Sequence, residues 1–80
     1  MKIPRDCTGP ELARALRKFG YTFDRQTGSH VIYTTQQGGE HHVTFPNHRP
    51  IKVGTLHDTL KAIAAHHRMT VEDLLRELAL

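Results

Sequence analysis

Large aromatic side chains and cysteines are scarce in this 80-residue chain, which has no tryptophan, three phenylalanines, two tyrosines and one cysteine. The single Cys7 cannot close a disulfide within the chain, so a disulfide-stapled scaffold is excluded. We expect Cys7 to be an ordinary small buried residue. Because so few large rings are available, most of them are expected to pack in the core, including Tyr21, Phe23, Tyr33 and Phe45. The alternative for these rings on the predicted strands is that some stay exposed and single-stranded RNA stacks on them.

Long apolar segments are missing as well. No run approaches the roughly 20 apolar residues that cross a bilayer, and residues 1–6 lack the apolar core of a signal peptide. We therefore expect a cytoplasmic protein without a membrane segment. The length fits one small domain over residues 1–80, in which a deep enclosed pocket is not expected because a chain of this size buries little surface.

Acidic residues are outnumbered by basic ones. Eleven Lys and Arg residues against eight Asp and Glu residues give a formal charge of +3 with all seven histidines neutral, and protonation of any histidine adds to it. This balance is compatible with a polyanionic partner such as RNA, although the imbalance alone is a weak signal.

The first regular element is a basic helix. Thr8 and Glu11 have the spacing of a capping box, which predicts a helix start at this point. Gly20 can end the helix in a left-handed conformation. One apolar stripe follows helical spacing: Leu12, Ala15, Leu16 and Phe19. Three cations fall on or beside the opposite, wet face: Arg14, Arg17 and Lys18.

Three strands are expected next, over residues 21–26, 30–35 and 40–45, because these segments are rich in β-branched and aromatic residues. The connectors, residues 26–29 and 37–39, are short and contain glycine, which favours hairpins and an antiparallel meander. Alternation along the second strand places His30 with Ile32 on one face and Val31 on the other, without indicating which face is covered.

Two more helices follow the strands. Residues 46–50 contain two prolines and break regular structure. A second helix is predicted to begin at Gly54, with Thr55 and Asp58 as its cap, and to carry the apolar stripe Leu56, Leu60, Ile63 and Ala64. A third, short helix over residues 70–79 is predicted to carry Leu74, Leu75 and Leu78, which either pack on the domain or form a surface for a partner.

The order of helix, three antiparallel strands and helix is an α+β arrangement like that of the double-stranded RNA-binding domain, here with an extra C-terminal helix. An ordered set of residues resembles the HicA toxins, small mRNA interferases of bacterial and archaeal toxin–antitoxin systems: Glu11-Leu12, Leu16, Gly20-Tyr21, Arg25-Gln26, Gly28-Ser29-His30, His42-Val43, Pro46 and Lys52-Val53-Gly54-Thr55-Leu56. The specificity lies in the whole set, since each short motif is common by chance.

The resemblance covers about residues 5–65 of a core expected to span residues 5–68. It implies a ribosome-independent endoribonuclease that cleaves single-stranded regions of mRNA, needs no metal or other cofactor, and is silenced by a HicB-type antitoxin that covers the active site. Many family members carry a second histidine directly after the catalytic one. This chain has Val31 at that position, which leaves His30 as the catalytic candidate in the motif.

The chemistry expected of His30 is proton transfer, because imidazole titrates near neutral pH and can take or give a proton during phosphodiester cleavage. The phosphate then needs a stabilising group, for which Lys52, Arg25 and the free amides of Gly54 and Thr55 are candidates. Further candidate contacts to RNA are Ser29, Arg14, Arg17 and Lys18. Each of these signals has a plainer interpretation as a turn residue, a solvated helix face, a strand-end lysine or a helix cap.

Adjacent histidines raise the question of a zinc site. The pair His41 and His42 is predicted to point to opposite faces of a strand, and helical neighbours such as His66 and His67 diverge by about 100°. Neither pair offers two ligands to one ion, so we expect no metal site and interpret these side chains as surface or half-buried histidines. His42 and His48 could lie near bound RNA.

Three classes of function therefore remain open from the sequence. The preferred one is a metal-independent mRNA interferase that acts through His30 and is neutralised by a HicB-type partner. A non-catalytic RNA-binding module would use the same basic helix and the same fold. An adaptor that binds only proteins would show neither RNA affinity that falls with salt nor toxicity on expression.

Overall fold

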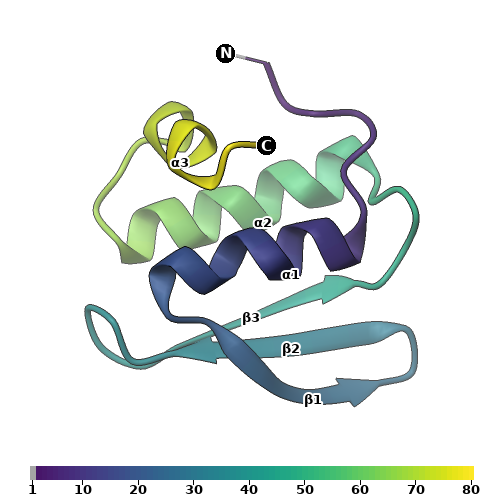
Figure 1. Cartoon of the computed structure of the whole chain (residues 1–80), viewed down its shortest axis with the longest axis horizontal. Helices are drawn as coiled ribbons and strands as arrows, with labels where there is room; N and C mark the ends of the chain where they lie inside the picture. Colours follow the sequence, from purple (N-terminus) through teal and green to yellow (C-terminus); the bar gives the residue numbers. More distant parts are fainter. Residues whose placement is uncertain (1) are drawn as a thin grey trace.

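The computed structural model describes residues 2–80, in which three helices lie on one side of a three-stranded sheet (Figure 1). The elements in chain order are α1 (Gly9–Leu16), a 3₁₀ turn (Arg17–Phe19), β1 (Thr22–Thr27), β2 (His30–Thr35), β3 (His41–Pro46), α2 (Val53–His66) and α3 (Val71–Leu78). The strands form an antiparallel sheet in the order β1-β2-β3. This arrangement confirms the predicted α+β fold similar to the double-stranded RNA-binding domain.

The start and the end of α1 follow the sequence signals. The Thr8 side chain accepts from the Glu11 amide, and the Glu11 carboxylate accepts from the Thr8 amide, which completes the capping box. At the other end the chain tightens into the 3₁₀ turn and reverses at Gly20, whose φ is +78°. A Cβ at Gly20 would also meet Thr35 Oγ1 at 2.9 Å, so glycine is required there on two counts.

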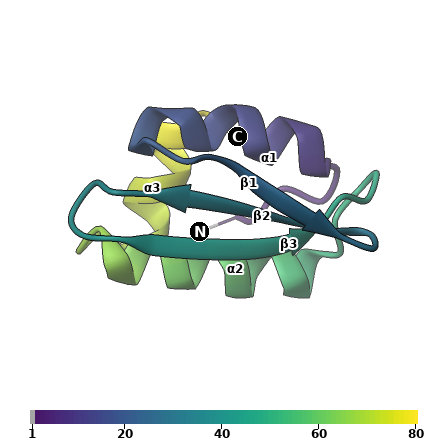
Figure 2. The same cartoon turned by 90° about the horizontal axis from the view of Figure 1, so that it is seen from below.

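The sheet has one face covered by helices and one open face. Val31 and Thr35 of β2 are buried, whereas His30 is exposed and shares the opposite face with Ile32 and Thr34. Figure 2 looks toward the open face of the sheet, with the helices behind it. The alternation predicted along β2 is therefore correct, and the structure adds that His30 belongs to the open face.

The core lies between the sheet and the helices. It contains Cys7, as expected, together with residues from every α-helix, from β2 and β3, and from the connecting segments. Its other members are Leu12, Leu16, Tyr21, Val31, Val43, Phe45, Ile51, Leu56, Leu60, Ile63, Ala64, Leu74 and Leu78. The expectation that the large rings pack inside holds for Tyr21 and Phe45, and Tyr33 is half-buried. It is wrong for Phe23, which is 57% exposed because β1 is an edge strand that the helices do not cover.

The start of α2 differs from the prediction. The helix begins at Val53, with the extended residue Lys52 at its N-cap, and the expected cap by Thr55 and Asp58 is not formed. Just before the helix, Ile51 is fixed in place, because its side chain is buried and its amide donates to Cys7 O at 2.8 Å. The helical turn then follows at once, which places Thr55 inside it, where its carbonyl accepts from Thr59 Oγ1.

The C-terminal helix packs on the domain. Thr70 caps α3 by accepting from the Asp73 amide, and Leu74 and Leu78 are buried in the core. The interpretation of α3 as a packed element is therefore the correct one of the two. None of the helices in the described part of the chain is long and apolar enough to cross a membrane.

Candidate functional site

His30 is the first residue of β2 and follows directly on the hairpin that joins it to β1. Its Cα pairs with Thr27 on β1 and with Pro46 on β3, so the imidazole stands in the middle of the sheet's width, at the end of the strands. The side chain is exposed on the open face. An exposed imidazole can meet a large substrate, which a buried histidine could not.

Backbone hydrogen bonds hold the loop after β3 against this hairpin. The Asn47 amide donates to Ser29 O at 2.7 Å, and the Gly9 amide donates to His48 O at 2.9 Å. A Cβ on Gly9 would lie 2.9 Å from Asn47 Cα, so only glycine fits this crossing of helix and loop. The segment that leads to α2 is thus fixed at the same end of the sheet as Ser29 and His30.

The N-terminus of α2 lies at that end too, on the right of Figure 1. Leu56 N is the first amide to bond inside the helix, to Lys52 O, so the amides of Val53, Gly54 and Thr55 precede the helical ladder. No side chain caps them. Uncapped amides and the positive end of the helix dipole favour an anion, and the exposed ammonium of Lys52 adds a full charge beside them.

We call Ser29, His30, Lys52, Gly54 and Thr55 the His30 site. All five are exposed, which fits a shallow surface that receives a polymer rather than a pocket that encloses a small molecule. All five are predicted from the sequence as site residues. The hairpin before β2 and the start of α2, which carry them, lie at one end of the molecule (Figure 1), with His30 on the open face of the sheet and α2 in the helix layer on the other side.

Arg25 lies beside the His30 site but is partly neutralised. Its Cα pairs with Ile32, the open-face neighbour of His30 on β2. Its guanidinium donates to Asp24 Oδ2 at 3.1 Å on the surface. An exposed pair of this kind is weak, so a phosphate could compete for the guanidinium.

The cations of α1 and of the 3₁₀ turn lie elsewhere. Arg14 and Lys18 border a small pocket with the last residues of the chain, and Lys18 Nζ donates to Glu77 O at 2.8 Å, at the end of α3. Arg17 lines a different pocket, next to Tyr21 and Phe23. The structure therefore does not group Arg14, Arg17 and Lys18 with His30, although all three are exposed as expected.

The opposite end of the sheet holds a cluster that the sequence did not reveal. Tyr21 Oη lies 2.8 Å from His41 Nδ1 and 3.1 Å from His67 Nε2, and the His66 ring stacks on His41 with ring centroids 4.3 Å apart. We call Tyr21, His41, His66 and His67 the histidine cluster. The predicted divergence of His41 from His42 is correct, since His42 bonds on the open face, to Thr34 and Glu40.

The environment of the cluster lowers the pKa of two of its histidines. Partial burial disfavours the imidazolium of His41 and of His67, and the neighbouring His66 adds repulsion, so the pKa of each falls below its usual 6.5. Burial also raises the pKa of Tyr21 to about 12. The pairing of these residues depends on the docking of α2 against β3, and no local sequence pattern could have identified it.

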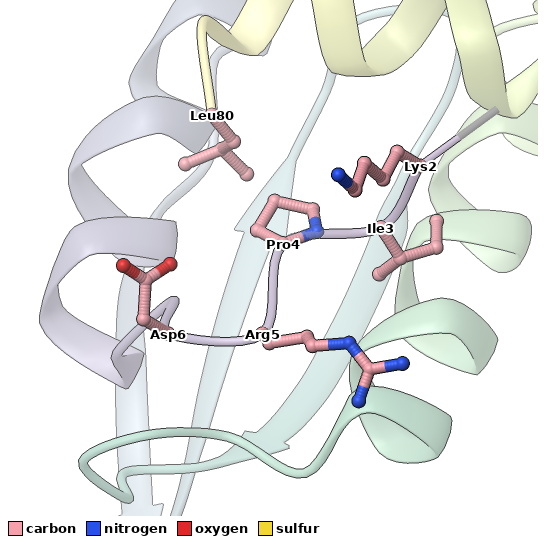
Figure 3. Close-up of a pocket in the computed structure, with 6 residues that line it drawn as sticks. All are labelled: Lys2, Ile3, Pro4, Arg5, Asp6 and Leu80. Atoms are coloured by element: carbon pink, nitrogen blue, oxygen red, sulfur yellow. The ribbon is translucent and has the colours of Figure 1, made fainter.

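Within residues 2–80, no set of three or more His, Cys, Asp and Glu side chains is arranged to hold a metal ion. A pocket of about 710 Å³ lies between the N-terminal segment and the chain end and is lined by Lys2, Ile3, Pro4, Arg5, Asp6 and Leu80 (Figure 3). It contains none of the residues selected from the sequence.

Comparison with known proteins gives one match. No curated protein matches this chain, and neither does any solved structure. A family model described as the HicA toxin of bacterial toxin–antitoxin systems matches residues 9–65, which run from the first residue of α1 to the last turn of α2. This match covers well over half of the chain and includes every residue of the His30 site, so the chain belongs to the HicA toxin family.

Proposed function

We propose that this toxin is a metal-independent endoribonuclease that cleaves mRNA with His30 as its general acid or base. The observation that carries the proposal is the position of His30, exposed on the open sheet face at the end of the molecule where α2 begins, in the layer on the other side of the sheet, with uncapped amides and Lys52 that can hold a phosphate. A proton-transfer group and an anion-binding group are the two parts that phosphodiester cleavage requires.

The reaction follows from the chemistry of the ribose. Neutral His30 takes the proton from the 2′-hydroxyl as that oxygen attacks the adjacent phosphorus, or its imidazolium protonates the leaving 5′-oxygen. The first product is then a 2′,3′-cyclic phosphate. Lys52 and the amides of Gly54 and Thr55 offer charge and N–H donors to the phosphate oxygens, with Ser29 and Arg25 at its margin.

An antitoxin partner follows from family membership, and we propose that it is a HicB-type protein that covers the His30 site. Every residue of the site is exposed, so a protein surface laid across it would block an RNA strand directly. The proposed substrate places the toxin in the cytoplasm, where mRNA is found.

A second candidate function is a non-catalytic RNA-binding module. The exposed cations Arg14, Arg17 and Lys18, which lie away from His30, favour it, because they could hold RNA without any role in chemistry. The two candidates differ in whether bound RNA is cut and whether His30 is needed for the cut.

Cleavage of a single-stranded RNA by the purified protein in excess EDTA tests the proposal. We expect His30→Ala to retain RNA binding and to lower the cleavage rate by about 10²- to 10⁴-fold, the usual contribution of a positioned acid or base. His57→Ala is the matched control, since His57 lies on α2 outside the site and should retain wild-type cleavage. Equal cleavage by folded His30→Ala protein would remove His30 from the mechanism, and binding without cleavage by the wild type would favour the RNA-binding module.

A further inference from the structure

Phe23 is the most exposed large apolar side chain in the described residues, at 57%. It belongs to β1, all six residues of which are exposed, and its Cα pairs with Tyr33 on β2. Along β2, Tyr33 points to the face opposite His30, which is the helix-covered face. Its partner Phe23 points to the same face, at the edge of the sheet that the helices do not cover. Exposed sheet edges usually carry polar residues, so an exposed phenylalanine at this edge indicates an interaction site.

The Phe23 ring contacts a second ring behind it. Phe23 meets Tyr33 edge-on with ring centroids 5.7 Å apart, and Tyr33 stacks on Phe45 with centroids 5.6 Å apart. Phe45 is fully buried, so the three rings form a row that runs from the core to the surface. The outermost ring is therefore supported from behind, while its remaining surface faces solvent.

A pocket of about 320 Å³ opens beside this ring and is lined by Arg17, Gly20, Tyr21, Thr22, Phe23 and Tyr33. Arg17 supplies its only charge. Among residues 2–80, no ion pair within 4.0 Å involves Arg17, so its guanidinium is free to meet an anion. The pocket thus combines an aromatic surface with an unpaired cation.

We propose that this pocket is a stacking site for an unpaired RNA base, with the Phe23 ring against the base and the Arg17 guanidinium on a neighbouring phosphate. Aromatic rings and arginine are the groups that bind single-stranded RNA, since every base has a face that can stack and every nucleotide carries a charge. This inference rests on the proposed function and extends it, because it assigns a contact outside the His30 site.

The geometry connects the two sites. Phe23 lies four residues from Thr27, the partner of His30, which is about 13 Å along β1. A strand of RNA that leaves His30 on the open face would pass around the edge formed by β1 and reach Phe23 a few nucleotides away. The site binds the RNA and takes no part in the bond cleavage.

The absence of tryptophan from the chain makes a direct test available. In Phe23→Trp protein the new indole is the only one present, and we expect its fluorescence to be quenched when a short single-stranded 2′-O-methyl RNA binds. This RNA lacks the attacking 2′-hydroxyl, so it cannot be cut. Ala62→Trp, on the exposed face of α2, is the matched control and should keep its fluorescence.

A second variant separates stacking from simple apolar contact. Phe23→Leu keeps an apolar side chain but has no ring, and we expect it to weaken binding of the same RNA by roughly 5- to 150-fold, the equivalent of one lost stack. Indole fluorescence that stays unquenched when RNA binds to Phe23→Trp protein, or wild-type affinity in Phe23→Leu, would overturn the inference and leave the pocket to an apolar side chain of a protein partner.

Failure of this inference can be told apart from failure of the proposed function. If cleavage of ordinary RNA is lost on substitution of His30 but unchanged on substitution of Phe23, the stacking site alone is overturned. Quenching in Phe23→Trp by the 2′-O-methyl RNA, together with no cleavage by the wild-type protein of ordinary RNA of the same sequence, would support the stacking site and overturn the nuclease.

Discussion

The hydroxyl of Tyr21 lies between two imidazoles, and a hydroxyl can donate only one hydrogen bond. One of His41 and His67 therefore accepts from Tyr21 and the other donates to it, which requires a neutral ring for the acceptor. His66 Nε2 lies 2.9 Å from Gln37 O and 3.1 Å from Gly39 O, so it donates to carbonyls of the β2–β3 turn. The cluster thus joins α2 to the sheet through a network that depends on protonation.

This network predicts a loss of stability in mild acid. The pKa values of His41 and His67 are lower in the folded protein than in the unfolded chain, so the unfolded chain takes up protons first as the pH falls. We expect the free energy of unfolding to be unaffected by these two groups above about pH 6.5 and to decrease below it until the folded-state pKa values are passed. Urea denaturation across this range measures the effect.

The double variant His41→Gln, His67→Gln supplies the check. It removes both titrating groups while keeping polar side chains at these positions, so its unfolding free energy should vary less with pH than that of the wild type. An identical pH dependence in the two proteins would show that the histidine cluster does not control the acid transition.

At the scale of the element, the N-terminus of α2 lacks a side-chain cap. Lys52 has an extended backbone, as an N-cap residue needs, but its side chain cannot accept from the first amides. The other two α-helices begin with a threonine that does accept. A lysine with uncapped amides behind it favours an anion, as the proposed phosphate contact requires.

We therefore expect Lys52→Ser to stabilise the fold and to weaken RNA binding. A serine at this position should raise the free energy of unfolding by about 1 kcal/mol, measured by urea denaturation. The same change removes one cation from the His30 site, so the slope of log affinity against log salt should fall by about 1.

Lys61→Ser is the matched control for this prediction, since Lys61 is exposed in the middle of α2. There serine replaces a better helix former without capping anything, and the unfolding free energy should decrease by a few tenths of a kcal/mol. RNA affinity that is unchanged in Lys52→Ser would remove Lys52 from the phosphate site.

At the scale of the whole molecule, α3 completes the core although the family match ends at residue 65. Leu74 is fully buried and Leu78 nearly so, and Lys18 of the 3₁₀ turn donates to Glu77 O near the end of α3. The last helix therefore contributes to the stability of the domain that carries the His30 site, even though no residue of that site belongs to it.

Leu74→Ala tests this role. We expect it to lower the free energy of unfolding by about 2–5 kcal/mol, the cost of truncating a buried leucine, which is a large part of the total for a small domain. Leu80→Ala should change it by less than about 0.5 kcal/mol, because Leu80 is 36% exposed. A small loss in Leu74→Ala, by chemical denaturation, would mean that α3 packs only loosely.

Local chemistry made much of this molecule predictable from its sequence. The capping box of Thr8, the reversal at Gly20 and the alternation around His30 depend on neighbours within a few residues, and each is as expected in the structure. The ordered motif set identified the family in the same way. The start of α2 was misplaced because the anchor of Ile51 on Cys7 O joins segments far apart in the chain.

Tertiary packing decided the rest. Strand alternation separates the His30 face of the sheet from the opposite face, but it does not indicate which of the two the helices cover. The docking of the helices decided this. The same docking left Phe23 exposed at the edge, separated Arg14, Arg17 and Lys18 from His30, and assembled the histidine cluster. The sequence by itself determined the elements, their order and the family, because these arise from short-range patterns. The arrangement of side chains from different elements arose only when the core closed.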